Sequence, residues 1–388
     1  MVKIEGFSFL LASLIIFFSS TQLGLHFWPA SSLVYGIRID YLSPTLYFLD
    51  ILIIFYLVVQ FLRKKLRFPI IHHSLFIILL VNLLFTSNPL ATLSWSLHFL
   101  LYYLFFKSLS PSTIYHLPST ISIALLLQLL LASAQVSLGH SVGGLMYYLG
   151  ERTVAVGTPA VALGTFMGSV VLRAYGTFSH PNVLAGWSVI CLLILTKLKS
   201  NIYLLASASV FTIFSVLLTQ SRSAALSLFS LVIPFHLIQR NKTRIIYFSF
   251  LVFCFFGFLS LLTPPRSDLS LSQRLDLQGV SLKAISNYPI FGTGAQSSIS
   301  TYPATFAQMN SGQRLLQPDH NSLTLFLSWF GIFGVLAILY SLRSNIIHYS
   351  LFIIPIAPLL ALDHYLLTSP QGLFILLLYL RVTINHEP

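Results

Sequence analysis

A histidine closes the longest polar interval of this chain, within Pro318-Asp319-His320-Asn321-Ser322, directly before an apolar run that starts at Leu323. A neutral imidazole can take a proton from a substrate hydroxyl, and Asp319 or a backbone carbonyl could fix its tautomer. Alternatively, the same residues start a helix, with Asn321 or Ser322 as the cap and His320 facing water. The residue types leave both interpretations open.

Arginines next to apolar runs are the second candidates for chemistry. Arg222 lies in Thr219-Gln220-Ser221-Arg222-Ser223-Ala224, a very short turn between two strongly apolar runs, and Arg173 and Arg274 lie in other polar segments. Such a guanidinium can clamp an anionic group such as phosphate through paired hydrogen bonds. The alternative is a helix-end arginine whose charged tip reaches the lipid headgroups.

Two further polar junctions contain histidine. In the segment 173–182, Ser179 and Asn182 can cap the helix that follows, but capping does not explain His180 beside Arg173. Asp363-His364 is a second acid–histidine pair, in another short turn. We treat this pair as a weaker candidate than His320.

The elements that position these residues are membrane spans. The chain has 388 residues, of which 56% are hydrophobic and 8% charged, far from the roughly 25% charged of a soluble protein. With about 20 apolar residues per span, we predict an all-α polytopic membrane protein with about twelve transmembrane helices. The predicted spans are 7–24, 45–62, 69–86, 93–108, 112–134, 183–197, 202–218, 223–238, 245–262, 322–341, 346–362 and 371–381.

Loop charge predicts the orientation of these spans. Starting inside, this order puts the basic clusters at 63–67, 197–199 and 240–244 on the cytoplasmic side. Both termini are then cytoplasmic, and the candidate chemistry is extracytoplasmic. We divide the chain into an N-terminal bundle at 1–134 and a second region at 135–388.

The second region contains two long outer segments, 135–182 and 263–320. The first is rich in glycine among apolar residues, which is compatible with a re-entrant or interfacial element. Within the second, residues 271–286 place Leu271, Leu275, Leu282 and Ile285 near one helical face. This pattern predicts an amphipathic helix at the outer interface.

Several site and partner classes are not supported. The net charge of +12 sits in loops between spans, so no soluble basic face exists for nucleic acid. No spacing of His, Asp or Glu resembles a metal site, and no nucleotide-binding or nucleophile-elbow motif is present. We therefore predict no metal and no cofactor.

Taken together, four motifs resemble the O-antigen ligase and O-antigen polymerase superfamily. They are Arg173 with Gly176-Thr177-Phe178-Ser179-His180-Pro181-Asn182, then Ser221-Arg222-Ser223, then Arg274 with Asn287-Tyr288-Pro289-Ile290-Phe291-Gly292-Thr293-Gly294, and finally His320-Asn321-Ser322 with Gly331-Ile332-Phe333-Gly334. The likeness covers about residues 150–340. Leu275 and Leu277 follow Arg274 where many members have a bulky aromatic, which makes the role of Arg274 less secure.

The resemblance implies a GT-C-like helical fold with a large extracytoplasmic loop between late helices. It also implies a polysaccharide-forming enzyme of the cell envelope, in the cytoplasmic (inner) membrane of a prokaryote. The donor would be a glycan linked to a polyprenyl diphosphate such as undecaprenyl diphosphate, and the acceptor a hydroxyl on a lipid, glycan or protein. By resemblance, Arg222, Arg274 and Arg173 would bind the diphosphate and His320 would be the base. Asp319, Asn321 and His180 would lie in the second shell or on the acceptor side.

The competing hypothesis is a transporter or flippase for a lipid-linked or small anionic solute. Such proteins have internal repeats and broken helices that meet near the bilayer midplane. The candidate charges gather at the outer edge of the spans instead. The sequence therefore favours a membrane glycosyltransferase that inverts the anomeric centre.

Overall fold

A computed structural model describes residues 2–63, 73–198, 200–230, 269–309, 315–342 and 353–384. The predicted span 245–262 lies outside these residues, as do the start of the span at 69, the end of the span at 223–238 and the first part of the span at 346–362. Cys254 and the basic cluster at 240–244 lie outside them as well.

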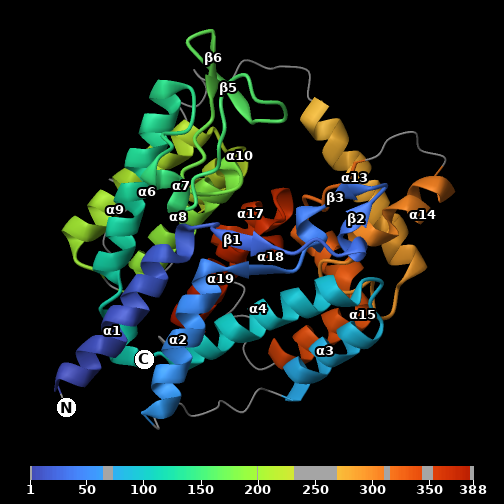
Figure 1. Ribbon diagram of the computed structural model, residues 1–388, viewed down its shortest axis with the longest axis horizontal. Coiled ribbons are helices and arrows are strands. Elements are labelled where there is room, and N and C mark those ends of the chain that lie inside the picture. Colours follow the sequence, from blue (N-terminus) through green and yellow to red (C-terminus); the bar gives the residue numbers. More distant parts are fainter. Residues whose placement is uncertain are drawn as a thin grey trace.

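The described part is mostly helical (Figure 1). The longer helices are α1 (Val2–Phe17), α2 (Phe48–Leu62), α3 (His73–Leu84), α4 (Pro89–Ser108), α6 (Pro118–Leu138), α8 (Pro181–Lys197), α9 (Ile202–Thr219), α10 (Arg222–Ser230), α13 (Leu269–Asn287), α15 (Ser322–Leu342) and α19 (Pro370–Ile384). The shorter ones are α5 (Pro111–Tyr115), α7 (Leu145–Tyr148), α14 (Tyr302–Gln308), α17 (Ala357–Leu362) and α18 (Tyr365–Thr368).

Four described helices are long and apolar enough to cross a membrane, namely α4, α6, α9 and α15. Five shorter apolar helices accompany them. A polytopic, largely helical membrane protein is thus confirmed, whereas the count of about twelve spans is not. The predicted span 112–134 was wrong as one helix, because Pro118 starts a new helix after α5.

The chain is not purely helical, because three two-stranded antiparallel sheets lie in the connecting segments. They pair β1 (Gly24–His26) with β4 (Thr45–Tyr47), β2 (Leu33–Val34) with β3 (Ile37–Arg38), and β5 (Leu163–Phe166) with β6 (Ser169–Leu172). The segment 135–182 therefore holds a β-hairpin where we expected a re-entrant or interfacial element. Two residues with positive φ, Met167 and Gly168, make its tight turn.

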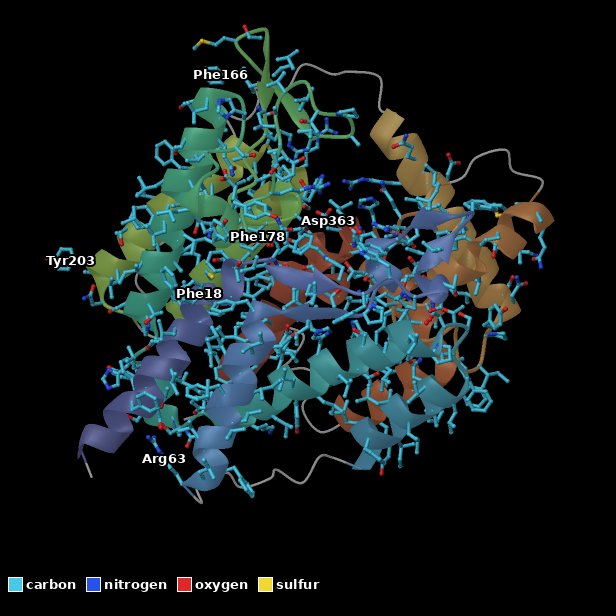
Figure 2. All side chains as sticks on the ribbon, in the orientation of Figure 1. Phe18, Arg63, Phe166, Phe178, Tyr203 and Asp363 are labelled. Atoms are coloured by element: carbon cyan, nitrogen blue, oxygen red, sulfur yellow. The ribbon has the colours of Figure 1, made fainter. Side chains whose placement is uncertain are left out.

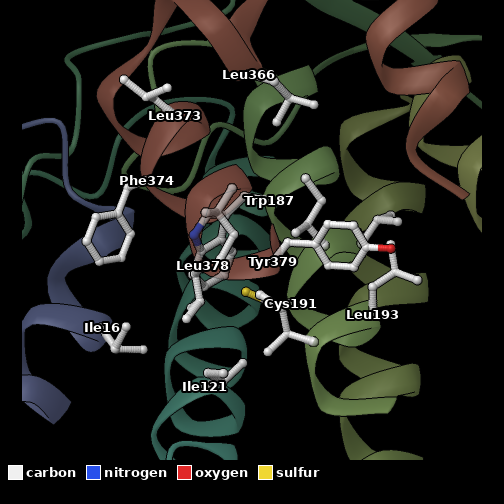
Figure 3. Packing of buried hydrophobic residues seen from close by; sticks show 14 of the residues in the cluster. Ile16, Ile121, Trp187, Cys191, Leu193, Leu366, Leu373, Phe374, Leu378 and Tyr379 are labelled. Carbon is white, nitrogen blue, oxygen red and sulfur yellow. The ribbon is translucent and has the colours of Figure 1, made fainter. Parts of the chain in front are cut away.

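The main core surrounds α8, whose side chains from Pro181 to Leu195 are all buried. This helix packs against α6, α9, α10 and α19. Figure 3 shows Trp187 and Cys191 of α8 next to Leu378 and Tyr379 of α19. Buried on every side, α8 is a fixed frame for the residues at its start.

A second, smaller core joins the first outer segment to the late one. Val34, Ile39 and Leu42 are buried together with Leu277 and Val280 of α13. The helix predicted at 271–286 is confirmed as α13, and two leucines of the predicted apolar face lie on the surface. Leu275 and Leu282 are 59% and 53% exposed, because α13 contacts the protein through positions 277, 280 and 284.

The helix α15 is interrupted near its middle, and the turn that follows α13 packs into the interruption. Gly331, at φ 60° and ψ −168°, interrupts α15 and frees backbone groups in mid-span. The turn at 288–294 fills this break, with the Ile332 amide donating to the Pro289 carbonyl (2.9 Å) and the Thr293 amide to the Ser328 carbonyl (2.8 Å). The predicted turn at Gly292-Thr293-Gly294 is thereby also a docking element, and it fixes α13 relative to α15.

Candidate functional site

Asp363 is the point at which the starts of several helices meet. It lies between α17 and α18, is buried (3% exposed), and sits in the interior of the molecule (Figure 2). Its Oδ1 accepts a hydrogen bond from Asn182 Nδ2 of α8 (3.0 Å), and its Oδ2 accepts one from the Ser223 hydroxyl of α10. The Ser322 hydroxyl of α15 donates to the Asp363 carbonyl (2.6 Å). The carboxylate thus connects α8 with α10, and the main-chain carbonyl of the same residue connects them to α15.

His320 lies against this carboxylate. Its Nδ1 is 3.8 Å from Asp363 Oδ1, which is an ion-pair distance and too long for a hydrogen bond. This Nδ1 is buried and has no hydrogen-bond partner among the described residues, while the side chain as a whole is 23% exposed. A small movement would join His320 Nδ1–H to Asp363 and leave Nε2 as the free base.

The charge of Asp363 is stabilised by its neighbours. Burial raises the pKa of the carboxyl, but His320, Ser223, Arg274 and Asn182 outweigh burial and hold the pKa below its ordinary value. A buried carboxylate that stays ionised is a suitable partner for a protonated imidazole.

Asp319, one of the two groups suggested for fixing the tautomer of His320, is bonded to the start of α15. Its Oδ1 accepts from the Asn321 amide (3.0 Å) and its Oδ2 from the Thr324 hydroxyl. Asn321 caps α15, because its Oδ1 accepts from the amides of Leu323 (2.9 Å) and Thr324 (3.2 Å). Both residues therefore build the helix start that carries His320.

Arg173 is held inside the same network. Its Nε donates to the Thr219 carbonyl (2.6 Å) and its Nη2 to Asn182 Oδ1 (2.7 Å). Burial lowers the pKa of Arg173 to about 10, with Arg274 and Arg222 nearby adding to the effect. The guanidinium stays charged at neutral pH, and it orients the Asn182 amide toward Asp363.

Arg222 and Arg274 approach from two other elements. Arg222 is exposed in the first turn of α10, next to Ser223. Arg274 is half-buried on α13, and its Nη1 donates to the Leu362 carbonyl (2.8 Å), one residue before Asp363. The three predicted arginines thus gather around one junction although the sequence separates them widely.

His180 is the cap of α8. Its Nδ1 accepts a hydrogen bond from the Asn182 amide (3.2 Å), which puts the ring proton on Nε2. The amide groups at a helix start disfavour a cation there. His180 can therefore offer a hydrogen-bond donor at the edge of the arginine cluster.

His364, from the weaker candidate pair Asp363-His364, packs against the ring of His320. The two ring centroids are 4.9 Å apart. His364 Nδ1 is hydrogen-bonded to the Thr368 hydroxyl (2.7 Å). Burial, and to a smaller extent the nearby His320, lower the pKa of His364 to about 3. The sequence signal was present in Asp363-His364, but only the fold brings that pair to His320.

Tyr41 is a residue at this site that sequence reasoning missed. Its ring meets His364 edge-on, with centroids 5.6 Å apart and an interplanar angle of 82°. No pattern in the first outer segment singles out this tyrosine. Its neighbour Asp40 is exposed.

No group of three or more His, Cys, Asp or Glu side chains in the described ranges could hold a metal ion. The junction places a histidine beside a carboxylate, with arginines near both.

One of three comparisons with known proteins gave a match. The family model described as O-antigen ligase matches residues 207–339, which contain Arg222, Arg274 and His320. No curated protein and no solved structure matched the chain. At family level this domain is that of an O-antigen ligase-type membrane glycosyltransferase. The match over residues 207–339 supports the resemblance to the O-antigen ligase and polymerase superfamily.

Proposed function

We propose that this protein transfers a glycan from a polyprenyl-diphosphate donor to an acceptor hydroxyl at the outer face of the cytoplasmic membrane. The observation that carries the proposal is the position of His320 against buried Asp363, within a junction that also holds Arg173 and Arg274. A base and cationic groups at one place are what a glycosyl transfer with an anionic leaving group needs.

His320 is the proposed base. With Nδ1–H directed at Asp363, its Nε2 accepts the proton of the acceptor hydroxyl as the oxygen attacks the anomeric carbon of the donor sugar. The bond from that carbon to the diphosphate oxygen breaks, and the diphosphate leaves with the electron pair. Attack opposite the leaving group inverts the anomeric centre. A positioned base contributes typically ~10²–10⁴-fold.

Arg222 and Arg274 are the proposed diphosphate clamp. The leaving group gains negative charge and needs that charge stabilised, and charge-assisted hydrogen bonds contribute roughly 1.5–3 kcal/mol each. Arg173 uses two of its donors within the protein. Its part is therefore to add positive charge and to hold Asn182, and through Asn182 to hold Asp363.

The test is glycan transfer by purified protein. The donor would be the lipid-linked glycan that accumulates in cells lacking this chain, and the acceptor a detergent extract of their membranes. We expect His320→Ala and Arg222→Ala each to reduce product formation at least about 100-fold. The matched control is His140→Ala, an exposed histidine of the 135–182 segment, which should keep its activity.

Retained turnover in both variants would rule out this assignment. Uptake of solute into vesicles by the wild-type protein, without glycan product, would favour a transporter instead.

A further inference from the structure

The contacts continue beyond His320, on the side away from Asn182. His364 touches His320, and Tyr41 touches His364. Among the described residues, none forms a hydrogen bond with the Tyr41 hydroxyl or with Nε2 of His364. Polar groups without protein partners, next to a base, are available to a substrate.

The fold fixes Tyr41 at this place. The Ser32 hydroxyl donates to the Leu42 carbonyl (2.9 Å), and the Ile39 amide donates to the Ser32 carbonyl (3.0 Å), which closes the first outer segment on itself. Leu42, next to Tyr41, is buried in the small core with α13. Tyr41 is consequently held on a packed element, as a recognition residue must be.

The two groups on this side of His320, Tyr41 and His364, are uncharged at neutral pH. Burial and the neighbouring Asp40 raise the pKa of Tyr41 to about 12, and Arg152 partly opposes them. His364, with its lowered pKa, is also uncharged at neutral pH. Two neutral polar groups and an aromatic edge suit an uncharged, hydroxyl-rich ligand better than an anion.

We infer that Tyr41 and His364 bind the sugar of the acceptor and present its hydroxyl to His320, so that Tyr41 is an acceptor-specificity residue. This inference rests on the proposed function and deepens it. Tyr41 lies outside the residues that the O-antigen ligase family model matches, 207–339. Acceptor choice would then reside in a segment outside the matched domain, while Arg222 and Arg274 of the matched domain bind the donor.

The experiment measures saturation by each substrate separately. Purified wild-type, Tyr41→Phe and Tyr41→Ala proteins receive the lipid-linked glycan from cells lacking this chain, with a titrated detergent extract of the same membranes as acceptor. Transferred glycan and released polyprenyl diphosphate are both measured. Tyr35→Phe is the control, because Tyr35 is an exposed tyrosine of the same segment outside the site (45% exposed).

We expect Tyr41→Phe to raise the acceptor amount at half-saturation by about three- to ten-fold, as for the loss of one neutral hydrogen bond. Donor half-saturation and maximal rate should stay within about two-fold, which also shows that the variant is folded. Tyr41→Ala should have a larger effect in the same direction.

Unchanged acceptor saturation in both variants would overturn the inference, as would a rise in donor half-saturation alone. In those outcomes the wild-type protein still makes product and the proposed function stands. A wild-type protein that neither transfers glycan nor releases polyprenyl diphosphate would defeat the proposed function, and this inference with it.

Discussion

The two sides of His320 differ in how much of their hydrogen bonding the fold has completed. Toward Asp363, both carboxylate oxygens are bonded, and the Asn182 side chain bonds through both of its polar atoms. Toward Tyr41, the tyrosine hydroxyl and the second nitrogen of His364 have no partner among the described residues. On the Asp363 side, the carboxylate and the Asn182 side chain are hydrogen-bonded within the protein, and we call this the closed side. On the Tyr41 side, polar groups remain for a ligand, and we call this the open side.

This difference corresponds to two tasks. Groups that stabilise charge in a transition state act best when their positions are set in advance, because no reorganisation is then needed during the reaction. Groups that recognise a substrate must leave donors and acceptors for it. The closed side thus suits the reaction that family members share, and the open side suits the choice of acceptor.

Asp363→Asn is the substitution that breaks the closed side most sharply. An asparagine would keep its oxygen toward Asn182 Nδ2 and His320 Nδ1, because both lie at Oδ1, but it has no charge to stabilise the imidazolium that forms when His320 takes a proton. We expect the maximal rate to fall about 10²–10⁴-fold with donor saturation little changed. The measurement is glycan transfer under saturating donor.

Asp319→Asn is the matched control for that variant, because asparagine also caps a helix start. It should reduce the rate by no more than about three-fold. Equal losses in the two variants would mean that both aspartates act only through stability.

Gly331→Ala tests whether both sides depend on the position of α15. A Cβ on Gly331 would overlap the Ile290 carbonyl, and the backbone there has a conformation that is essentially limited to glycine. We expect at least about 1–3 kcal/mol of destabilisation, measured by thermal unfolding in detergent, and weaker donor and acceptor saturation together. Gly157→Ala, where a Cβ meets no atom within 4 Å, should be neutral.

Lowering the pH should reduce the stability that the charged Asp363 contributes, and this effect should be smaller than those of the substitutions above. The pKa of Asp363 is depressed in the folded protein relative to its ordinary value of 3.8, so its stabilising contribution is complete above that pH and is lost as pH falls through the folded pKa. The unfolding midpoint should drop as pH falls below about 4, and less so in Asp363→Asn. Identical pH dependence in the two proteins would contradict a charged Asp363.

Much of the site could be anticipated from local pattern. Arginines and histidines at the edges of apolar runs are conspicuous because charge is disfavoured there. Asn321 as a helix cap and α13 as a helix also followed from their neighbours along the chain. Which face of α13 packs on the protein did not follow from the sequence, because spacing alone does not separate a stripe that faces the interface from one that faces the core.

What the sequence determined by itself is a membrane protein with polar junctions at the starts of its helices, since apolar run length and capping chemistry are local properties. Only the tertiary structure decided the partner of His320. Asp319 is adjacent in sequence, but its carboxylate accepts a hydrogen bond from the backbone at the start of α15. Asp363 lies next to His320 because α8, α10 and α17 pack together. Tyr41 likewise depends on a core shared between the first and late outer segments. Such contacts join residues far apart in the chain, so no spacing rule could reveal them.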